Sequence, residues 1–129
     1  FAMSDAALHP AVTLRLYTDH KCFGPGVAML LRRVRELHSL RSAAMDMDMA
    51  YSKAWTILRE AERGLGFKLL HSTTGGRGGG GAVLTPQGEQ LLEAYDLCER
   101  ELKETAERLF ARHLAPFAVT GEPEGPEEL

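Results

Sequence analysis

The sequence predicts a mainly α-helical fold with one small β-hairpin, and three observations lead to this prediction. The stretch 39–65 holds two helical patterns separated by aspartates. Short β-type runs flank a glycine-rich segment at 75–81. From residue 86 onward, apolar residues recur at alternating steps of four and three, which is typical of a long helix with a coiled-coil seam. Together these elements predict a winged helix-turn-helix followed by a long dimerisation helix.

The composition is that of an ordinary soluble protein. The 129 residues are 44% hydrophobic and 26% charged, which suits one domain with a modest core. Because no apolar run approaches the roughly 18 residues of a membrane span, we expect no membrane partner and a cytoplasmic location. Cys22 and Cys98 show no CxxC spacing and are expected to be free thiols.

Charge is distributed unevenly along the chain. Residues 1–82 hold 11 basic and 7 acidic residues, a net charge of +4, whereas residues 83–129 hold 4 and 11, a net charge of −7. Binding to phosphate depends on the local patch more than on the total. The net charge of −3 therefore does not exclude a nucleic-acid partner. The small basic excess predicts weak non-specific affinity.

A strand and a helix are expected ahead of the helix-turn-helix. The stretch 13–18 alternates leucines with polar residues and predicts a short strand, and 20–23 is interpreted as a connection. Pro25 suits the first turn of the following helix, since its missing N–H has no helical partner to lose. The expected core-facing stripe of that helix consists of Val27, Leu30, Leu31, Val34 and Leu37.

The helix-turn-helix itself is predicted from caps and periodicity. Ser39 is a suitable N-cap for a short helix, and Asp46 and Asp48 favour a turn because aspartate bonds to its own backbone. A second helix, about 50–65, follows. At about 100° per residue its apolar side chains form one narrow stripe: Ala54, Ile57, Leu58, Ala61 and Leu65.

The polar side of this second helix suits recognition in the major groove of double-stranded DNA. Ser52, Thr56 and Arg59 lie opposite the apolar stripe and are the candidate base or phosphate contacts. Lys53, near the helix start, is expected to meet phosphate. The other DNA-binding candidates are Arg41 as a phosphate clamp and Tyr51, which together with Trp55 is as compatible with packing as with DNA contact.

The glycine-rich segment is predicted to be the wing. Stretches 67–73 and 82–84 are expected to pair as strands, joined by the loop 75–81. Arg77 is the only charged residue of this loop, and a lone arginine on a thin loop suits a minor groove. The loop also matches GxGxxG, but a dinucleotide site needs a helix directly afterwards, and a β-type run follows here. A linker without function is the alternative.

The long helix is expected to span about 86–113, with Thr85 as its N-cap. Its seam is a candidate dimerisation surface made of Leu91, Tyr95, Cys98, Leu102 and Leu109. Packing against its own domain is the alternative. Residues 1–12, which begin with an apparent cloning remnant before Met3, and the acidic, proline-containing stretch 114–129 are expected to be disordered.

Catalysis and metal binding find no support in the sequence. It contains neither GxSxG nor HExxH, the five histidines lack ligand spacing, and Met45, Met47 and Met49 are expected to pack around the turn. We therefore expect no enzyme activity, no cofactor and no metal. The competing hypothesis is a winged-helix module that binds proteins and has no direct DNA role.

Three segments also carry a family resemblance: GPGVAMLLRRV, SLRSAAMDMDMAYSKAW and LLHSTTGGRGGGGAVLTPQGEQLLEAYD. They resemble the N-terminal DNA-binding domain of the molybdate-responsive transcriptional regulators, which is similar to the LysR-type winged helix. The resemblance spans about 13–97 and is most specific in the A-Y-x-x-A-W block and in 75–88. It implies a homodimeric, bacterial-type DNA-binding regulator whose subunits pair through the long helix.

Two departures from that family limit what the resemblance implies. Ala50 stands where the family usually has a serine that caps the recognition helix, and this loses a cap of about 1 kcal/mol. Only about thirty residues follow the core of the long helix, so the oxyanion-binding domain is not expected in this chain. No molybdate binding is therefore expected here.

Overall fold

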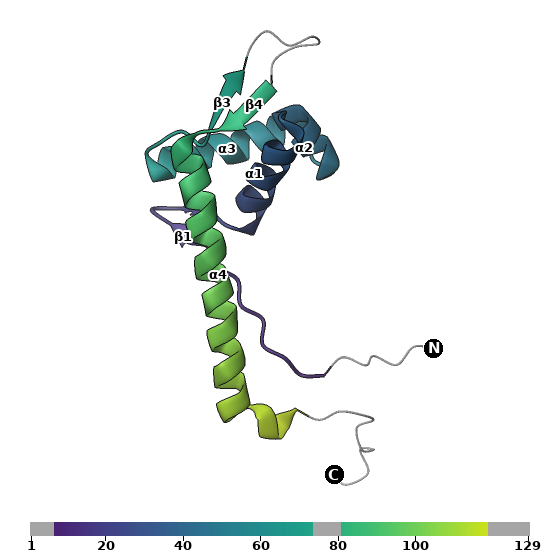
Figure 1. Ribbon diagram of the computed structural model, residues 1–129, viewed down its shortest axis with the longest axis vertical. Helices are drawn as coiled ribbons and strands as arrows, with labels where there is room; N and C mark the ends of the chain where they lie inside the picture. The colour runs from purple at the N-terminus through teal and green to yellow at the C-terminus, as the bar shows by residue number, and fades with distance from the viewer. Residues whose placement is uncertain (1–6, 74–80, 119–129) are drawn as a thin grey trace, which may run out of the picture. The chain divides into compact units, whose positions relative to one another are not determined.

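The structure is a computed structural model that describes residues 7–73 and 81–118 (Figure 1). Its contacts divide the chain into two compact units, of which one comprises residues 13–99. The described part of the other comprises residues 7–12 and 100–118. Residues 13–99 contain three helices, a hairpin and the start of a long fourth helix, so the predicted fold class is confirmed.

A small antiparallel sheet opens the larger unit. It pairs β1 (Leu16–Tyr17) with β2 (Lys21–Phe23), so the predicted strand at 13–18 is shorter than expected. The interpretation of 20–23 as a connection is wrong. Phe23 is fully buried and meets the Tyr95 ring edge-on at 5.0 Å between centroids. That partner lies 72 positions away in the chain, and local periodicity carries no signal of it.

Three helices form the centre of this unit: α1 (Pro25–Leu37), α2 (Leu40–Asp46) and α3 (Tyr51–Leu65). Ser39 caps α2 as predicted, because its Oγ accepts a hydrogen bond of 3.0 Å from the Ser42 N–H. Asp48 turns the chain toward α3 with a φ of 59°, a left-handed conformation that aspartate tolerates. Ala50 precedes α3 without a capping side chain.

The core lies between these helices and matches most of the predicted stripes. On α3, Ala54, Leu58 and Ala61 are buried. On α1, the predicted stripe is buried except for Leu37, which is exposed. Leu37 is the last residue of α1, and His38 leaves the helix in the left-handed conformation with a φ of 61°. The helical face therefore ends before Leu37 can reach the core.

The hairpin pairs β3 (Leu70–Thr73) with β4 (Gly81–Leu84), with Leu70 opposite Leu84 and Thr73 opposite Gly81. The predicted strand at 67–73 is thus shorter, and Gly81 belongs to β4 rather than to the loop. The Ala82 N–H donates to the His38 carbonyl oxygen at 3.0 Å, which ties β4 to the junction between α1 and α2.

The fourth helix, α4 (Pro86–His113), begins as predicted. The Thr85 hydroxyl accepts a hydrogen bond from the Gly88 N–H at 2.9 Å and donates one to the Lys68 carbonyl oxygen at 2.6 Å. Two ion pairs join the beginning of α4 to α1, namely Arg35 with Glu89 and Arg32 with Asp96.

The burial of Tyr95 shows that its predicted place in the dimer seam is wrong. Its side chain is only 3% exposed, and its hydroxyl donates to the Leu14 carbonyl oxygen at 2.7 Å. Burial, and to a lesser extent the nearby Glu99 carboxylate, raises the pKa of Tyr95 above its ordinary value. Tyr95 therefore belongs to the hydrophobic core of the unit 13–99. Leu91 also packs partly against that core.

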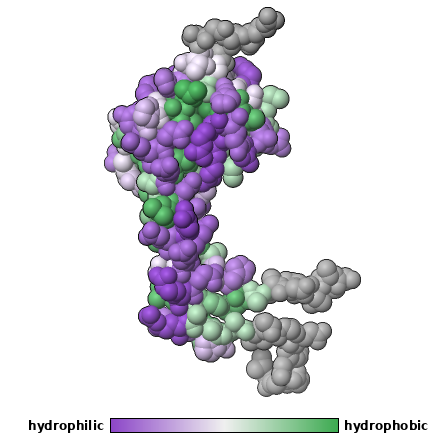
Figure 2. All heavy atoms as spheres, in the orientation of Figure 1, coloured by the Kyte–Doolittle hydropathy of each residue, from purple (hydrophilic) through white to green (hydrophobic). Residues whose placement is uncertain are grey.

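In the smaller unit, α4 continues to His113 and is followed by the short 3₁₀ helix η1 (Ala115–Phe117). The prediction of disorder for 114–129 is therefore wrong at η1, and residues 119–129 lie outside the described residues. Hydrophobic side chains reach the surface of this unit (Figure 2), among them Leu109, Leu114 and Phe117. None of the described helices is both long and apolar enough to span a membrane.

The close approach of β4 to the α1–α2 junction predicts a strict need for glycine at position 81. A Cβ atom there would lie 2.6 Å from the His38 carbonyl oxygen. We expect Gly81→Ala to lower the free energy of unfolding by about 1–3 kcal/mol in urea titrations. Gly26→Ala is the matched control, because a Cβ there meets nothing within 4 Å. Equal stability of the two variants would contradict this prediction.

Candidate nucleic-acid interface

The helix α3 presents a polar face to solvent opposite its buried stripe. Exposed on it are the predicted contact residues Ser52, Lys53, Thr56 and Arg59, together with Arg63. The Thr56 hydroxyl donates to the Ser52 carbonyl oxygen at 3.0 Å, so its orientation on the helix is set. The exposure of these side chains agrees with a recognition helix.

Two of the candidate arginines are held by aromatic rings. The Arg41 guanidinium carbon lies 4.1 Å from the centroid of the Tyr51 ring, and that of Arg59 lies 5.1 Å from the Trp55 ring. The two rings meet edge-on at 6.3 Å. Cation–π contact orients a guanidinium without neutralising its charge. The start of α2 and the helix α3 thus carry two guanidinium groups that aromatic rings orient.

The three arginines of α1 are neutralised instead. Arg32, Arg33 and Arg35 of α1 each lie within ion-pair distance of a carboxylate, such as Arg33 with Asp46 at 2.6 Å. Over residues 7–73 and 81–118, no carboxylate pairs with Arg41, Arg59 or the other basic residues exposed on α3. The unneutralised positive charge of the helix-turn-helix therefore lies on the face of α3 and the adjoining start of α2.

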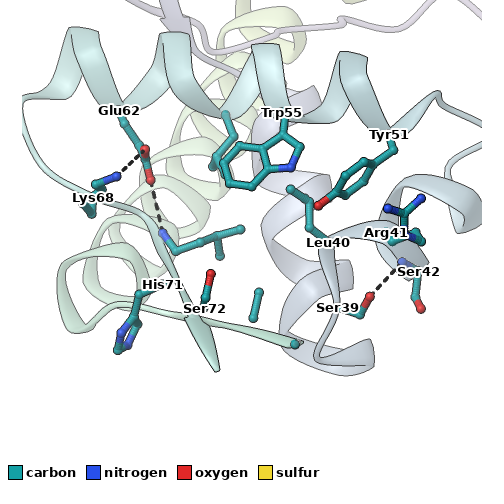
Figure 3. A pocket seen from close by; sticks show the side chains of 14 residues that line it. Ser39, Leu40, Arg41, Ser42, Tyr51, Trp55, Glu62, Lys68, His71 and Ser72 are labelled. Carbon is teal, nitrogen blue, oxygen red and sulfur yellow. Dashed lines mark hydrogen bonds and ion pairs between the residues drawn. The ribbon is translucent and has the colours of Figure 1, made fainter. Parts of the chain in front are cut away.

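Tyr51 and Trp55 take the packing role that the sequence left open, and their contact with DNA stays a prediction. Each is partly buried and packs against the hydrophobic core. Each also lines a groove of about 590 Å³ between the start of α2, the helix α3 and the β3–β4 hairpin. Figure 3 shows both rings projecting from α3 into this groove, with Arg41 and Ser42 at one end and Glu62 and Lys68 at the other.

Glu62 is a residue that the sequence analysis missed. Its Oε2 accepts hydrogen bonds from the backbone N–H groups of Leu69 and Leu70, at 2.8 and 3.3 Å. The side chain is 12% exposed. This carboxylate therefore fixes the beginning of β3 against α3. The signal in the sequence is an acidic residue at the edge of an apolar helical stripe, where a carboxylate needs a partner.

The remaining candidate residues are Arg77 of the predicted wing and three residues of α4. Arg77 lies outside the described residues, so its predicted wing contact stays a prediction. Cys98, Leu102 and Leu109 are exposed on α4. Within the described part of the chain, no group of three or more histidine, cysteine or acidic residues is arranged to hold a metal ion.

The three-helix core, the turn between α2 and α3 and the hairpin that follows define a winged helix-turn-helix domain. Residues 28–89 match the family of bacterial regulatory helix-turn-helix proteins of the lysR type. This part of the chain is therefore a lysR-type helix-turn-helix domain. The match runs from α1 to the start of α4 and includes the whole face described above.

Several curated proteins are similar to the chain. The DNA-binding transcriptional dual regulator ModE of Escherichia coli (strain K12) is 36% identical over 87 residues, which are 67% of this chain and 33% of that protein. The transcriptional regulator ModE of Haemophilus influenzae is 37% identical over 76 residues, 59% of this chain and 30% of that protein. The molybdenum-pterin-binding protein MopB of Rhodobacter capsulatus is 36% identical over 70 residues, 54% of this chain and 26% of that protein. The matched region thus spans about a third or less of these relatives' own length. The ModE relatives are regulators and not enzymes.

The hydrogen bonds of Glu62 predict that it stabilises the hairpin. Glu62→Ala leaves two backbone N–H groups without their acceptor, and we expect it to lower the free energy of unfolding by about 1–3 kcal/mol. Glu60→Ala, an exposed change two positions earlier on the same helix, should stay within about 0.5 kcal/mol of the wild type. Urea unfolding followed by circular dichroism measures both, and a Glu62→Ala variant as stable as Glu60→Ala would refute the assignment.

Proposed function

We propose that the chain binds double-stranded DNA sequence-specifically as a non-catalytic, cytoplasmic transcriptional regulator. The observation that carries this proposal is the row of oriented guanidinium groups on α2 and α3, whose charges no carboxylate neutralises within the described residues. The regulator names of the ModE relatives and the lysR-type match support it. In this proposal α3 enters the major groove.

Each exposed side chain then has a role. Ser52, Thr56 and Arg59 face base edges, and an arginine can make a bidentate contact with guanine. Lys53 and Arg41 contact phosphates, which position the domain without reading sequence. Arg77 on the wing, outside the described residues, reaches the minor groove or its backbone.

This proposal predicts a specific salt dependence. Arg59→Ala should weaken binding to a selected duplex by about 1–3 kcal/mol if it reads a base, and should lower the slope of log affinity against log salt. Fluorescence anisotropy at several salt concentrations measures both. Arg33→Ala is the control, because Arg33 is already paired with Asp46. An affinity for duplex that does not change with salt, or no binding at low salt, would contradict the proposed function. Either result would favour the protein-interaction module.

We infer further that the protein is a homodimer that pairs through α4. Tyr95 is excluded from the seam, but Leu102 and Leu109 are 38% and 44% exposed on one helical face. Apolar side chains that recur seven positions apart on a helix are suited to pairing with a second copy. Molybdate binding is not part of this proposal, since the relatives' names refer to proteins about three times the matched length.

Substitution within the seam should separate the subunits. We expect Leu102→Glu to raise the dimer dissociation constant at least about tenfold, because burial of a leucine contributes about 1.5–3 kcal/mol. Sedimentation equilibrium measures this constant. Leu97→Glu is the matched control. It makes the same chemical change at an exposed leucine that lies about 140° around the helix from Leu102. A wild-type chain that stays monomeric at high concentration would disprove the pairing.

A further inference from the structure

The groove between α2, α3 and the hairpin has walls of two kinds. Tyr51 and Trp55 give it an aromatic lining, whereas its ends carry basic and hydroxyl groups together with the Glu62 carboxylate. Arg41 and Ser42 come from α2, Lys68 precedes β3 and Ser72 lies within β3 (Figure 3). With a volume of about 590 Å³ it has the size of a ligand site, yet it is partly open to solvent.

The geometry of duplex DNA indicates what lies in such a groove. One sugar-phosphate strand separates each major groove from the adjacent minor groove. If α3 occupies the major groove and the wing reaches the minor groove, that strand has to pass between α3 and the hairpin. The groove is located between these two elements.

We propose that this groove is the channel for the sugar-phosphate backbone of one DNA strand, with Lys68 and Ser72 on the hairpin side and Arg41 on the α2 side as its phosphate contacts. The Trp55 ring packs against a deoxyribose, and its indole N–H is a donor to a phosphate oxygen. The inference rests on the proposed function. It adds Lys68 and Ser72, which the sequence analysis did not select, and it gives Trp55 a specific contact with the DNA backbone.

The charges of the channel fit a phosphodiester. The Lys68 ammonium lies 3.9 Å from Glu62 Oε1, and the Lys68 side chain is 78% exposed, so this ion pair is weak and leaves the ammonium accessible. The Glu62 carboxylate is largely buried, and its Oε2 is engaged by the N–H groups of Leu69 and Leu70. The accessible charge is therefore that of Arg41 and Lys68, and it is positive.

The first test compares two lysines of the same unit. Lys68→Ala should weaken binding to selected and random duplexes alike, by about three- to tenfold at low salt, and should reduce the salt slope by about one. Lys21→Ala removes an exposed lysine from β2 that does not line the groove, and it should leave the slope unchanged. Because both variants lose one positive charge, a difference between them reports the local contact.

The second test uses Trp55, which is the only tryptophan of the chain. Duplex in the channel should shield Trp55, so that acrylamide quenches its fluorescence less once DNA is bound. The measurement needs no substitution and is independent of the stability of any variant.

The outcomes separate the two proposals. In one outcome the wild-type chain binds duplex with a steep salt slope, both lysine variants keep that slope, and acrylamide still reaches Trp55. The proposed backbone channel is then contradicted, whereas DNA binding stands. If the wild-type chain shows no salt-dependent binding to duplex, both proposals are overturned.

Discussion

The carboxylate of Glu62 is the constraint on which the proposed interface depends. It holds the first residues of β3 against α3 through the N–H groups of Leu69 and Leu70. On the other side of the hairpin, the Ala82 N–H binds the His38 carbonyl oxygen at the α1–α2 junction. These contacts fix the base of the hairpin relative to α3, and in the proposed function this spacing determines whether both can meet one duplex.

The distribution of charge follows from the same architecture. Arginines on α1 face acidic residues of α2 and α4 and form ion pairs that join these helices. The arginines beside α3 meet aromatic rings instead, which orient them and leave their charge available. One residue type thus joins helices in one place and keeps an available charge in another, and the neighbouring side chains decide which.

The sequence was sufficient for the elements whose signals are local. The apolar stripe of α3, the Ser39 and Thr85 caps and the hairpin could all be predicted from spacing and residue type. The burial of Phe23 in β2 and the burial of Tyr95 could not, because the two rings meet across 72 positions of the chain and the Tyr95 hydroxyl bonds to Leu14, 81 positions away. The same holds for the groove, since residues of α2, α3 and the hairpin meet there only in the folded chain.

Selection of bound fragments from a random duplex library tests the central claim most directly. A lysR-type helix-turn-helix domain that pairs through α4 should enrich one inverted repeat, with half-sites centred about one helical turn or a multiple apart. Substitution of Arg59 should relax the preference at one position in each half-site. Enrichment of no sequence from the library, under conditions in which the chain is folded, would contradict the account.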